Sequence, residues 1–220
     1  MGLAILQQVT GVNTVVYYAP AIFKAAGLGS ASASIAATAG IGIVNVVMTA
    51  VAIWLLDRAG RKPLLLWSVA GMTIALALLG MGFALRGDEA SAGGALGRIT
   101  GISLTLYIAF FAIGLGPVFW LLISEIYPLK TRALAMSVAT VANWAANYLV
   151  AATFLSLTAV LGKAGIFWFY ALMGLVTWFF ILRLVPETKG KTLGEIEELF
   201  ANWKATKPTS GAGRMNPQPQ

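Results

Sequence analysis

Six long apolar stretches, separated by short polar segments, run along the first five-sixths of the chain. Each contains the roughly 20 residues that a helix needs to cross a bilayer. None alternates between apolar and polar positions as a membrane barrel strand does. We therefore predict an all-α polytopic membrane protein with six transmembrane helices. The predicted spans are Leu3–Ala26, Ile35–Leu56, Leu64–Leu85, Ile99–Ile126, Leu134–Leu161 and Ile166–Val185.

The composition agrees with a surface that faces lipid. The chain is 59% hydrophobic and 10% charged, whereas a soluble domain is about 25% charged. It contains no cysteine and no histidine, so it lacks thiolate ligands, disulfides and the commonest general base. We therefore expect no catalytic residues, no metal site and no enzymatic activity.

The basic residues predict an orientation in the membrane. Four of them fall on one side of the predicted spans: Lys24, Arg86, Arg98 and Lys163. The other eleven fall on the opposite side: Arg58, Arg61, Lys62, Lys130, Arg132, Arg183, Lys189, Lys191, Lys204, Lys207 and Arg214. The positive-inside rule places this second group and both termini in the cytoplasm, for a multi-pass protein of the plasma (cell inner) membrane. Because these charges lie in short loops and not on one accessible face, we expect no nucleic-acid partner.

The sequence predicts three regions. Residues 1–187 form the six-helix bundle. Residues 188–204 form a cytoplasmic amphipathic helix, in which Thr192 is placed to cap the first turn and Glu195 follows three positions later. Residues 205–220 are rich in Pro, Gly, Ser and Gln, and we expect them to be disordered.

Three amide side chains in the first span are the most informative polar positions. Gln7, Gln8 and Asn13 surround Gly11. On a continuous helix Asn13 would point about 140° away from Gln8. A break near Gly11 would bring the three amides toward one cavity, as discontinuous helices do at transporter substrate sites. The alternative is that the amides hydrogen-bond to neighbouring helices and only hold the bundle together.

Further polar and aromatic groups lie within the other spans. Pro117 predicts a kink in the fourth span, because it removes a backbone hydrogen bond. The remaining candidates are amides and indoles: Asn45, Trp120, Asn143, Trp144 and Asn147. Amides donate to and accept from hydroxyl groups, and indole rings offer flat faces to the C–H side of a sugar ring. This inventory, without a charge in the middle of a span, suits a neutral polyhydroxylated solute.

Five motifs, in order, resemble those of the sugar porter family of the major facilitator superfamily. They are Gln7-Gln8-x-x-Gly11-x-Asn13 with Tyr17-Tyr18-x-Pro20; Asp57-Arg58-x-Gly60-Arg61-Lys62; Gly116-Pro117-x-x-Trp120 followed by Ser124-Glu125-x-x-Pro128-x-x-x-Arg132; Asn143-Trp144-x-x-Asn147; and Pro186-Glu187-Thr188-Lys189-Gly190. They are similar to the seventh helix of that family, its loop between helices eight and nine, its tenth helix and following loop, its eleventh helix, and the segment after its twelfth.

The resemblance implies a fold and a function. The fold is the C-terminal half of a twelve-helix carrier, with 3+3 inverted repeats, and the N-terminal six-helix half is missing. The function is transport of a monosaccharide (a hexose, pentose or polyol) by alternating access, without a cofactor. The missing half would carry the titrating carboxylate of proton-coupled members, so this half leaves proton coupling undecided.

The resemblance also assigns residues. The expected sugar-binding set is Gln7, Gln8, Asn13, Asn45, Phe111, Trp120, Asn143, Trp144 and Asn147. The expected cytoplasmic charge network is Asp57, Arg58, Arg61, Glu125, Arg132 and Glu187. Within it, we expect Glu125 and Arg132 to pair with groups of the 57–62 loop and with Glu187.

Other functions stay open at this point. The chain is alternatively a truncated, non-transporting remnant or the subunit of a split carrier. A carrier of another small solute on the same fold is a further alternative, because fold does not determine function. The partners expected on the sugar-carrier interpretation are a neutral sugar, the lipid bilayer and the N-terminal half.

Overall fold

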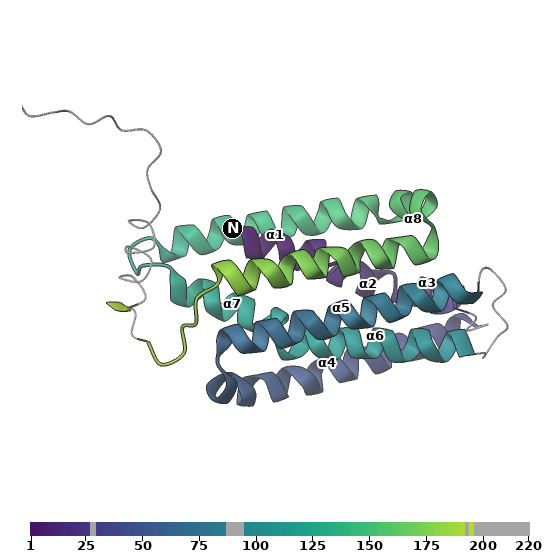
Figure 1. Ribbon diagram of the computed structural model, residues 1–220, viewed down its shortest axis with the longest axis horizontal. Helices are drawn as coiled ribbons and strands as arrows, with labels where there is room; N and C mark the ends of the chain where they lie inside the picture. Colours follow the sequence, from purple (N-terminus) through teal and green to yellow (C-terminus); the bar gives the residue numbers. More distant parts are fainter. Residues whose placement is uncertain (27–29, 87–94, 192–193, 196–220) are drawn as a thin grey trace, which may run out of the picture.

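The computed structural model of the chain describes residues 1–26, 30–86, 95–191 and 194–195. Every regular element in those ranges is a helix, and the long helices run roughly side by side (Figure 1). Most of the predicted amphipathic helix, and the whole of the tail predicted to be disordered, lie outside the described residues.

The first predicted span is interrupted twice. It consists of α1 (Gly2–Val9), α2 (Val12–Tyr17) and α3 (Ala19–Ala25). Gly11 separates α1 from α2 with φ of 84°, a left-handed conformation that glycine adopts without steric cost. The predicted break near Gly11 is thus confirmed. The second break, at Tyr18, was not predicted. Pro20 follows in the first turn of α3, where the missing N–H of proline leaves no helical partner unsatisfied.

The fourth predicted span is also broken. The second and third spans are continuous in α4 (Ala31–Ala59) and α5 (Arg61–Arg86). The fourth consists of α6 (Ala95–Ile113) and α7 (Leu115–Ile126), with Gly114 between them at φ −134° and ψ −80°. The predicted kink is present, but it lies three residues before Pro117. In a continuous helix the Pro117 ring would clash with the carbonyl four residues earlier, which belongs to Ile113.

The last helix, α8 (Arg132–Leu184), reverses direction at Gly162, where φ is 74°. Its two limbs, 132–161 and 163–184, run back along each other (Figure 1). The predicted separation of the fifth span from the sixth is therefore confirmed.

Within the described residues, four segments are long and apolar enough to cross a membrane: Ala31–Ala59, Arg61–Leu85, Gly97–Ile126 and Arg132–Leu184. The helices α1, α2 and α3 are each too short to qualify alone, and α8 counts once although it turns at Gly162. The count of six spans therefore stays a prediction.

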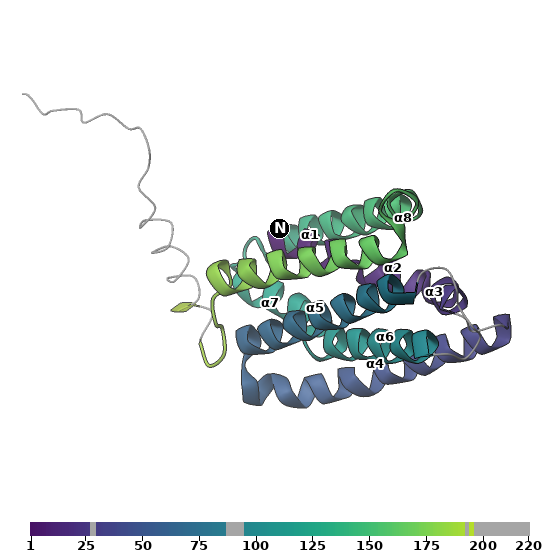
Figure 2. The same ribbon diagram turned by 45° about the vertical axis from the view of Figure 1, so that its right-hand side comes forward.

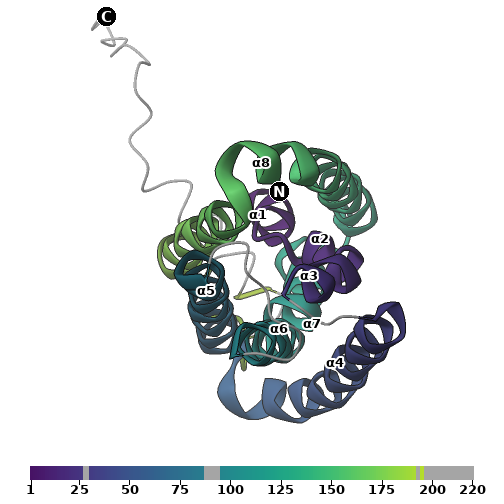
Figure 3. The same cartoon turned by 90° about the vertical axis from the view of Figure 1, so that its right-hand side faces the viewer.

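The core forms around α5. One side of this helix packs on the 163–184 limb of α8 and the other on α6 (Figure 3). Its buried face carries large apolar side chains: Leu64, Leu65, Val69, Met72, Leu76 and Leu79. Gly71 permits the close approach of α6, because a Cβ there would lie 2.3 Å from the Phe110 ring.

The short helices α1–α3 lie on the side of the bundle away from α5. They are flanked by α4 on one side and by the 132–161 limb of α8 on the other (Figures 2 and 3). Both flanking helices expose large apolar side chains, among them Val46 and Ile53 on α4 and Val141 and Leu149 on α8. Lipid or another apolar surface satisfies such positions without a polar covering.

Candidate functional site

Four side-chain amides meet in one hydrogen-bonded group, which we call the amide cluster: Gln7, Gln8, Asn13 and Asn143. Gln8 Nε2 donates to Asn143 Oδ1 at 3.0 Å, and Asn143 Nδ2 donates to Gln7 Oε1 at 2.7 Å. Asn13 Nδ2 donates to Gln8 Oε1 at 3.0 Å. The break at Gly11 therefore brings the three amides of the first span into one hydrogen-bonded group. That they line one cavity stays a prediction.

The amide cluster also ties three helices to one another. Asn143 Nδ2, on α8, donates to the Ala4 carbonyl of α1 at 2.8 Å, and Gln7 Nε2 donates to the Leu115 carbonyl of α7 at 2.9 Å. Gln7, Gln8 and Asn143 are each at most 5% exposed. Buried amides of this kind need partners, so these three side chains do hold the bundle together, as the alternative interpretation proposes.

Asn13 stands at the open edge of the cluster. Its side chain is half-buried, and among the described residues it makes a single hydrogen bond, to Gln8. An asparagine amide has two N–H donors and an acceptor oxygen. One N–H and the Oδ1 atom of Asn13 therefore remain available to a ligand.

Two tyrosines support the break at Gly11. Tyr107 on α6 donates from its hydroxyl to the Thr10 carbonyl at 2.9 Å, at the end of α1. Thr10 Oγ1 donates to the Gln7 carbonyl at 2.7 Å. The ring of Tyr170 lies against Gly11, where a Cβ would come within 2.7 Å of it. The sequence analysis did not single out either tyrosine. The available signal was a phenolic hydroxyl inside an apolar span, which needs a hydrogen-bond partner when buried.

The other predicted sugar-binding residues are not joined to the amide cluster by hydrogen bonds. Asn147 is buried and donates to the Tyr17 hydroxyl at 3.4 Å, a long and weak bond. Asn45 lies on α4 and lines a separate cavity of about 70 Å³ with Val15 and Ile108. Three aromatic candidates complete the set: Phe111 is half-buried, whereas Trp120 and Trp144 are exposed.

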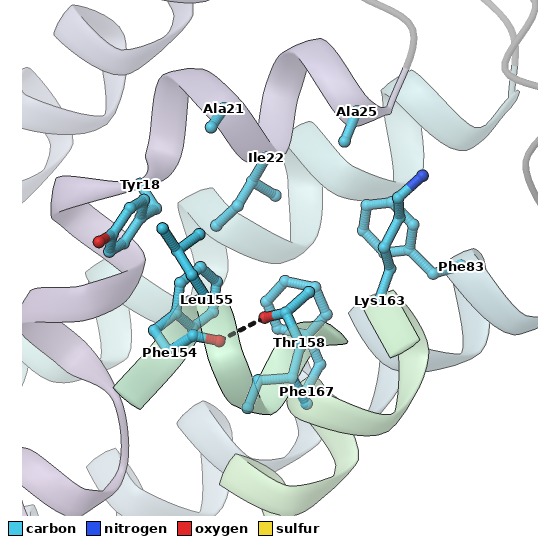
Figure 4. A pocket seen from close by; sticks show the side chains of 11 residues that line it. Tyr18, Ala21, Ile22, Ala25, Phe83, Phe154, Leu155, Thr158, Lys163 and Phe167 are labelled. Carbon is cyan, nitrogen blue, oxygen red and sulfur yellow. Dashed lines mark hydrogen bonds between the residues drawn. The ribbon is translucent and has the colours of Figure 1, made fainter. Parts of the chain in front are cut away.

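A larger cavity, of about 150 Å³, lies at the opposite end of the bundle from the 57–62 loop (Figures 1 and 4). Its walls are mostly apolar and come from α3, α5 and both limbs of α8, with Ile22, Phe154 and Phe167 among them and Lys163 beside them. None of the predicted sugar-binding residues lines it. Such walls offer few partners to a polyhydroxylated solute, so the amide cluster is the better candidate.

The residues of the expected charge network lie at the other end of the bundle, where α4 turns into α5, α7 leads to α8, and the chain leaves α8 (Figure 1). Arg61 Nη2 pairs with Glu125 Oε1 at 2.9 Å, and both side chains are largely buried. Thr188 Oγ1 donates to the second oxygen of Glu125 at 2.6 Å. Glu125 thus joins the start of α5 to the segment that follows α8.

Glu187 caps a helix. Its carboxylate accepts from the backbone N–H groups of Arg61 and Lys62 at 3.0 Å each and from that of Lys189 at 2.9 Å. The N–H groups of Arg61 and Lys62 belong to the first turn of α5, so they have no partner within the helix. Burial alone would raise the pKa of Glu187, but the backbone hydrogen bonds together outweigh it and hold the pKa below its usual value. Gly60 leaves room for this contact, since a Cβ there would lie 2.9 Å from Glu187 Oε2.

The pairing expected for Arg132 is wrong. Arg132 Nε donates to the Tyr127 carbonyl at 3.3 Å, and Arg132 Nη2 is buried without a hydrogen-bond partner in the described part of the chain. The guanidinium turns back onto the loop that leads into α8 and does not reach Glu187, whose carboxylate is occupied by backbone N–H groups.

The last two members of the expected network make no ion pair among the described residues. Asp57 is exposed. The guanidinium of Arg58 lies over the Trp54 ring, 4.0 Å from its centroid, and the Arg58 carbonyl accepts from Lys189 Nζ at 2.6 Å.

Comparison with known proteins gives a consistent result. The family model described as "Sugar (and other) transporter" matches residues 1–200. The chain is 43% identical over 210 residues to the probable metabolite transport protein CsbC of Bacillus subtilis (strain 168), covering 95% of this chain and 44% of that protein. It is 42% identical over 197 residues to a D-xylose transporter of Levilactobacillus brevis, covering 90% and 42%.

Solved structures agree with the fold. The chain superposes on the major facilitator proton:xylose symporter XylE bound to 6-bromo-6-deoxy-D-glucose with a TM-score of 0.79, at 39% identity, covering 90% of this chain and 41% of that one. On the inward-open xylose transporter XylE from E. coli the TM-score is 0.73, at 38% identity. The chain spans less than half the length of these relatives, as expected for one half of the major facilitator fold.

Proposed function

This chain belongs to the sugar (and other) transporter family, and we propose that it forms the C-terminal wall of a membrane carrier for a neutral monosaccharide or polyol. The carrier would work by alternating access, with an N-terminal six-helix half supplying the opposite wall. The D-xylose transporter of L. brevis and a probable polyol transporter of Arabidopsis thaliana, both over 40% identical to this chain, support this class of substrate.

The amide cluster is the observation that carries the proposal. Three of its members are buried and bonded to one another, so the cluster presents a fixed arrangement before a ligand arrives. Asn13, at the edge of the cluster, has an acceptor and a donor that no other described residue uses. Neutral amides recognise hydroxyl groups without a formal charge to be balanced, which favours a sugar over an ionic solute.

We also propose an orientation in the membrane and a cellular location. The ends of the helices that carry the Arg61–Glu125 pair also hold most of the basic residues. The positive-inside rule places that end, and both termini, in the cytoplasm, for a protein of the plasma (cell inner) membrane.

Binding would need no cofactor, because hydrogen bonds to amides suffice for it. The carboxylates among the described residues all lie near or beyond the ends of the long helices. Asp57 lies near the end of α4 and Glu125 near the end of α7, whereas Glu187 and Glu195 follow α8. A carboxylate that titrates during proton symport would therefore come from the N-terminal half.

Sugar uptake into proteoliposomes tests the proposal. The carrier containing this chain and an N-terminal half should accumulate or equilibrate radiolabelled xylose, glucose or a polyol, and Gln8→Ala should reduce the rate at least about tenfold. The chain alone should not transport, because one wall of the site is absent. Failure of the complete carrier with every neutral sugar and polyol would refute the proposal, and transport of a charged solute in their place would favour the alternative carrier.

A further inference from the structure

The break between α6 and α7 leaves two backbone groups without their helical hydrogen-bond partners. In a continuous helix the Gly114 N–H would donate to the Phe110 carbonyl. Here it donates to the Phe111 carbonyl at 3.2 Å. The Phe110 carbonyl thereby loses its helical donor, and the Leu115 N–H, which opens α7, loses its helical acceptor. Both groups lie inside an apolar span, where an unpaired backbone group is costly.

One hydroxyl satisfies both groups. Ser68 Oγ, on the neighbouring α5, donates to the Phe110 carbonyl at 2.6 Å and accepts from the Leu115 N–H at 2.9 Å. The Ser68 side chain is fully buried. It therefore bridges the break and replaces the hydrogen bonds that the helix has lost.

The fit at this bridge is close. A Cβ on Gly114 would lie 2.3 Å from Ser68 Cβ and 2.6 Å from the Leu64 carbonyl. The backbone of the break therefore reaches the Ser68 hydroxyl because residue 114 is glycine. Ser68 and Gly114 act as one unit, contributed by two helices.

The bridge leads directly to the amide cluster. The Leu115 peptide is held by Ser68 at its N–H, and its carbonyl accepts from Gln7 Nε2 at 2.9 Å. Gln7 in turn accepts from Asn143 at 2.7 Å. A chain of hydrogen bonds thus runs from α5 through the start of α7 to the amides of α1 and α8.

We propose that Ser68 is a positioning residue: it fixes the α6–α7 break and, through Leu115, the orientation of the Gln7 amide in the substrate site. Ser68 itself does not contact the solute. The part that concerns substrate rests on the proposed sugar-carrier function, whereas the bridging of the break does not.

Amide hydrogen exchange on the complete carrier tests the bridge itself. The Leu115 amide should be protected although it opens a helix, where N–H groups ordinarily lack partners. Ser68→Ala should accelerate its exchange at least about tenfold. The matched control is Thr73→Ala, which removes a buried hydroxyl from the same helix that bonds only to the Val69 carbonyl of its own previous turn. An unprotected Leu115 amide in the unmodified carrier, or unchanged exchange in Ser68→Ala, would overturn the proposal.

Equilibrium binding of the transported sugar tests the link to the site. Ser68→Ala should raise the dissociation constant about tenfold, Ser68→Cys should raise it less because a thiol still donates and accepts weakly, and Thr73→Ala should leave it nearly unchanged. In a Gln7→Ala background, Ser68→Ala should have little further effect, because the two residues act through one contact. Additive effects of the two substitutions would refute the role of Leu115 as the link.

The two measurements separate the claims. If the unmodified carrier binds no sugar, the proposed function fails, and the exchange experiment still decides whether Ser68 bridges the break. If Ser68→Ala does not fold, protection of the Leu115 amide in the unmodified carrier and the affinity of Ser68→Cys decide it.

Discussion

Gln8 on α1 donates a hydrogen bond to Asn143 on α8 across 3.0 Å, although 135 positions separate the two residues in the sequence. Both side chains are almost fully buried. In this environment an amide that loses its partner costs free energy, because water does not replace the bond. The pair therefore holds α1 against α8, and it fixes the position of the Gln8 amide, to which Asn13 is bonded.

Truncation of either member should destabilise the protein. We expect Gln8→Ala and Asn143→Ala each to lower the free energy of unfolding by about 1–3 kcal/mol, since each leaves a buried partner unsatisfied. The double substitution should cost less than the sum of the two, because the second removes a partner already unpaired. Thermal unfolding in detergent micelles measures this. Asn147→Ala is the control, since its bond of 3.4 Å is weak; an equal loss for Asn147→Ala would contradict the special role of the pair.

Substitution at Gly11 should be far more costly than at another glycine of the bundle. Gly11→Ala places a Cβ on a residue with φ of 84° and within 2.7 Å of the Tyr170 ring. A left-handed conformation alone costs about 1–2 kcal/mol for a residue with a Cβ. In Gly40→Ala the new Cβ meets nothing within 4 Å, and alanine is the better helix former by about 0.5–1 kcal/mol. Unfolding midpoints should therefore fall for the first and hold or rise for the second; equal midpoints would contradict the strained break.

The positions of the breaks illustrate how far the sequence leads. Gly11 among three amides led to the prediction of the first break, because a break there lets the polar groups converge. Pro117 predicted a kink, but the break lies at Gly114. That position depends on which backbone groups find partners, and the partner is Ser68 of another helix.

Only part of the candidate site could be predicted, because residue types can be read from the sequence but the packing of the helices cannot. The types of residue indicated amide chemistry, and Gln7, Gln8, Asn13 and Asn143 do meet. Sequence periodicity does not show that Asn45 lines a different cavity, or that Arg132 folds back onto Tyr127. The first outcome depends on the rotation of one helix against another, which is set by packing, and the second on the backbone of the loop between α7 and α8.

Glu187 predicts a pH dependence of stability. Burial opposes ionisation of its carboxyl, but hydrogen bonds from the backbone lower its pKa below the ordinary 4.5. The stabilisation from the charged form is thus present above about pH 4.5 and is lost as the pH falls through the pKa of the folded state. Glu187→Gln should therefore lower the unfolding midpoint at pH 7, and the difference from the unmodified protein should shrink toward pH 3.

The control for this prediction is Asp57→Asn. Asp57 is exposed and makes no ion pair among the described residues, so its substitution should change the free energy of unfolding by less than about 0.5 kcal/mol. A Glu187→Gln difference that stayed constant from pH 7 to pH 3 would show that the carboxylate charge does not stabilise the start of α5.

The amides should divide into two functional groups. Asn13 and Asn45 carry donor or acceptor groups that the described part of the chain does not use, whereas those of Asn143 are bonded to Gln7, Gln8 and Ala4. If sugar binds at this wall, its hydroxyls bond first to the unused groups.

Asn13→Ala and Asn45→Ala should then each raise the sugar's dissociation constant by about 5–150-fold, which corresponds to 1–3 kcal/mol for a lost hydrogen bond. The unfolding midpoint of Asn45→Ala should stay unchanged, because no bond to another residue of the described part of the chain is lost. That of Asn13→Ala should fall, because the buried Oε1 of Gln8 loses its donor. Asn143→Ala should lower affinity and stability together. Calorimetric titration of the complete carrier, alongside thermal unfolding, separates the two patterns.

The result for Asn45 is decisive: it lies on α4, away from the amide cluster, and lines a small cavity with Val15 and Ile108. An unchanged affinity in Asn45→Ala would remove α4 from the site and confine sugar recognition in this half to the amides around the Gly11 break.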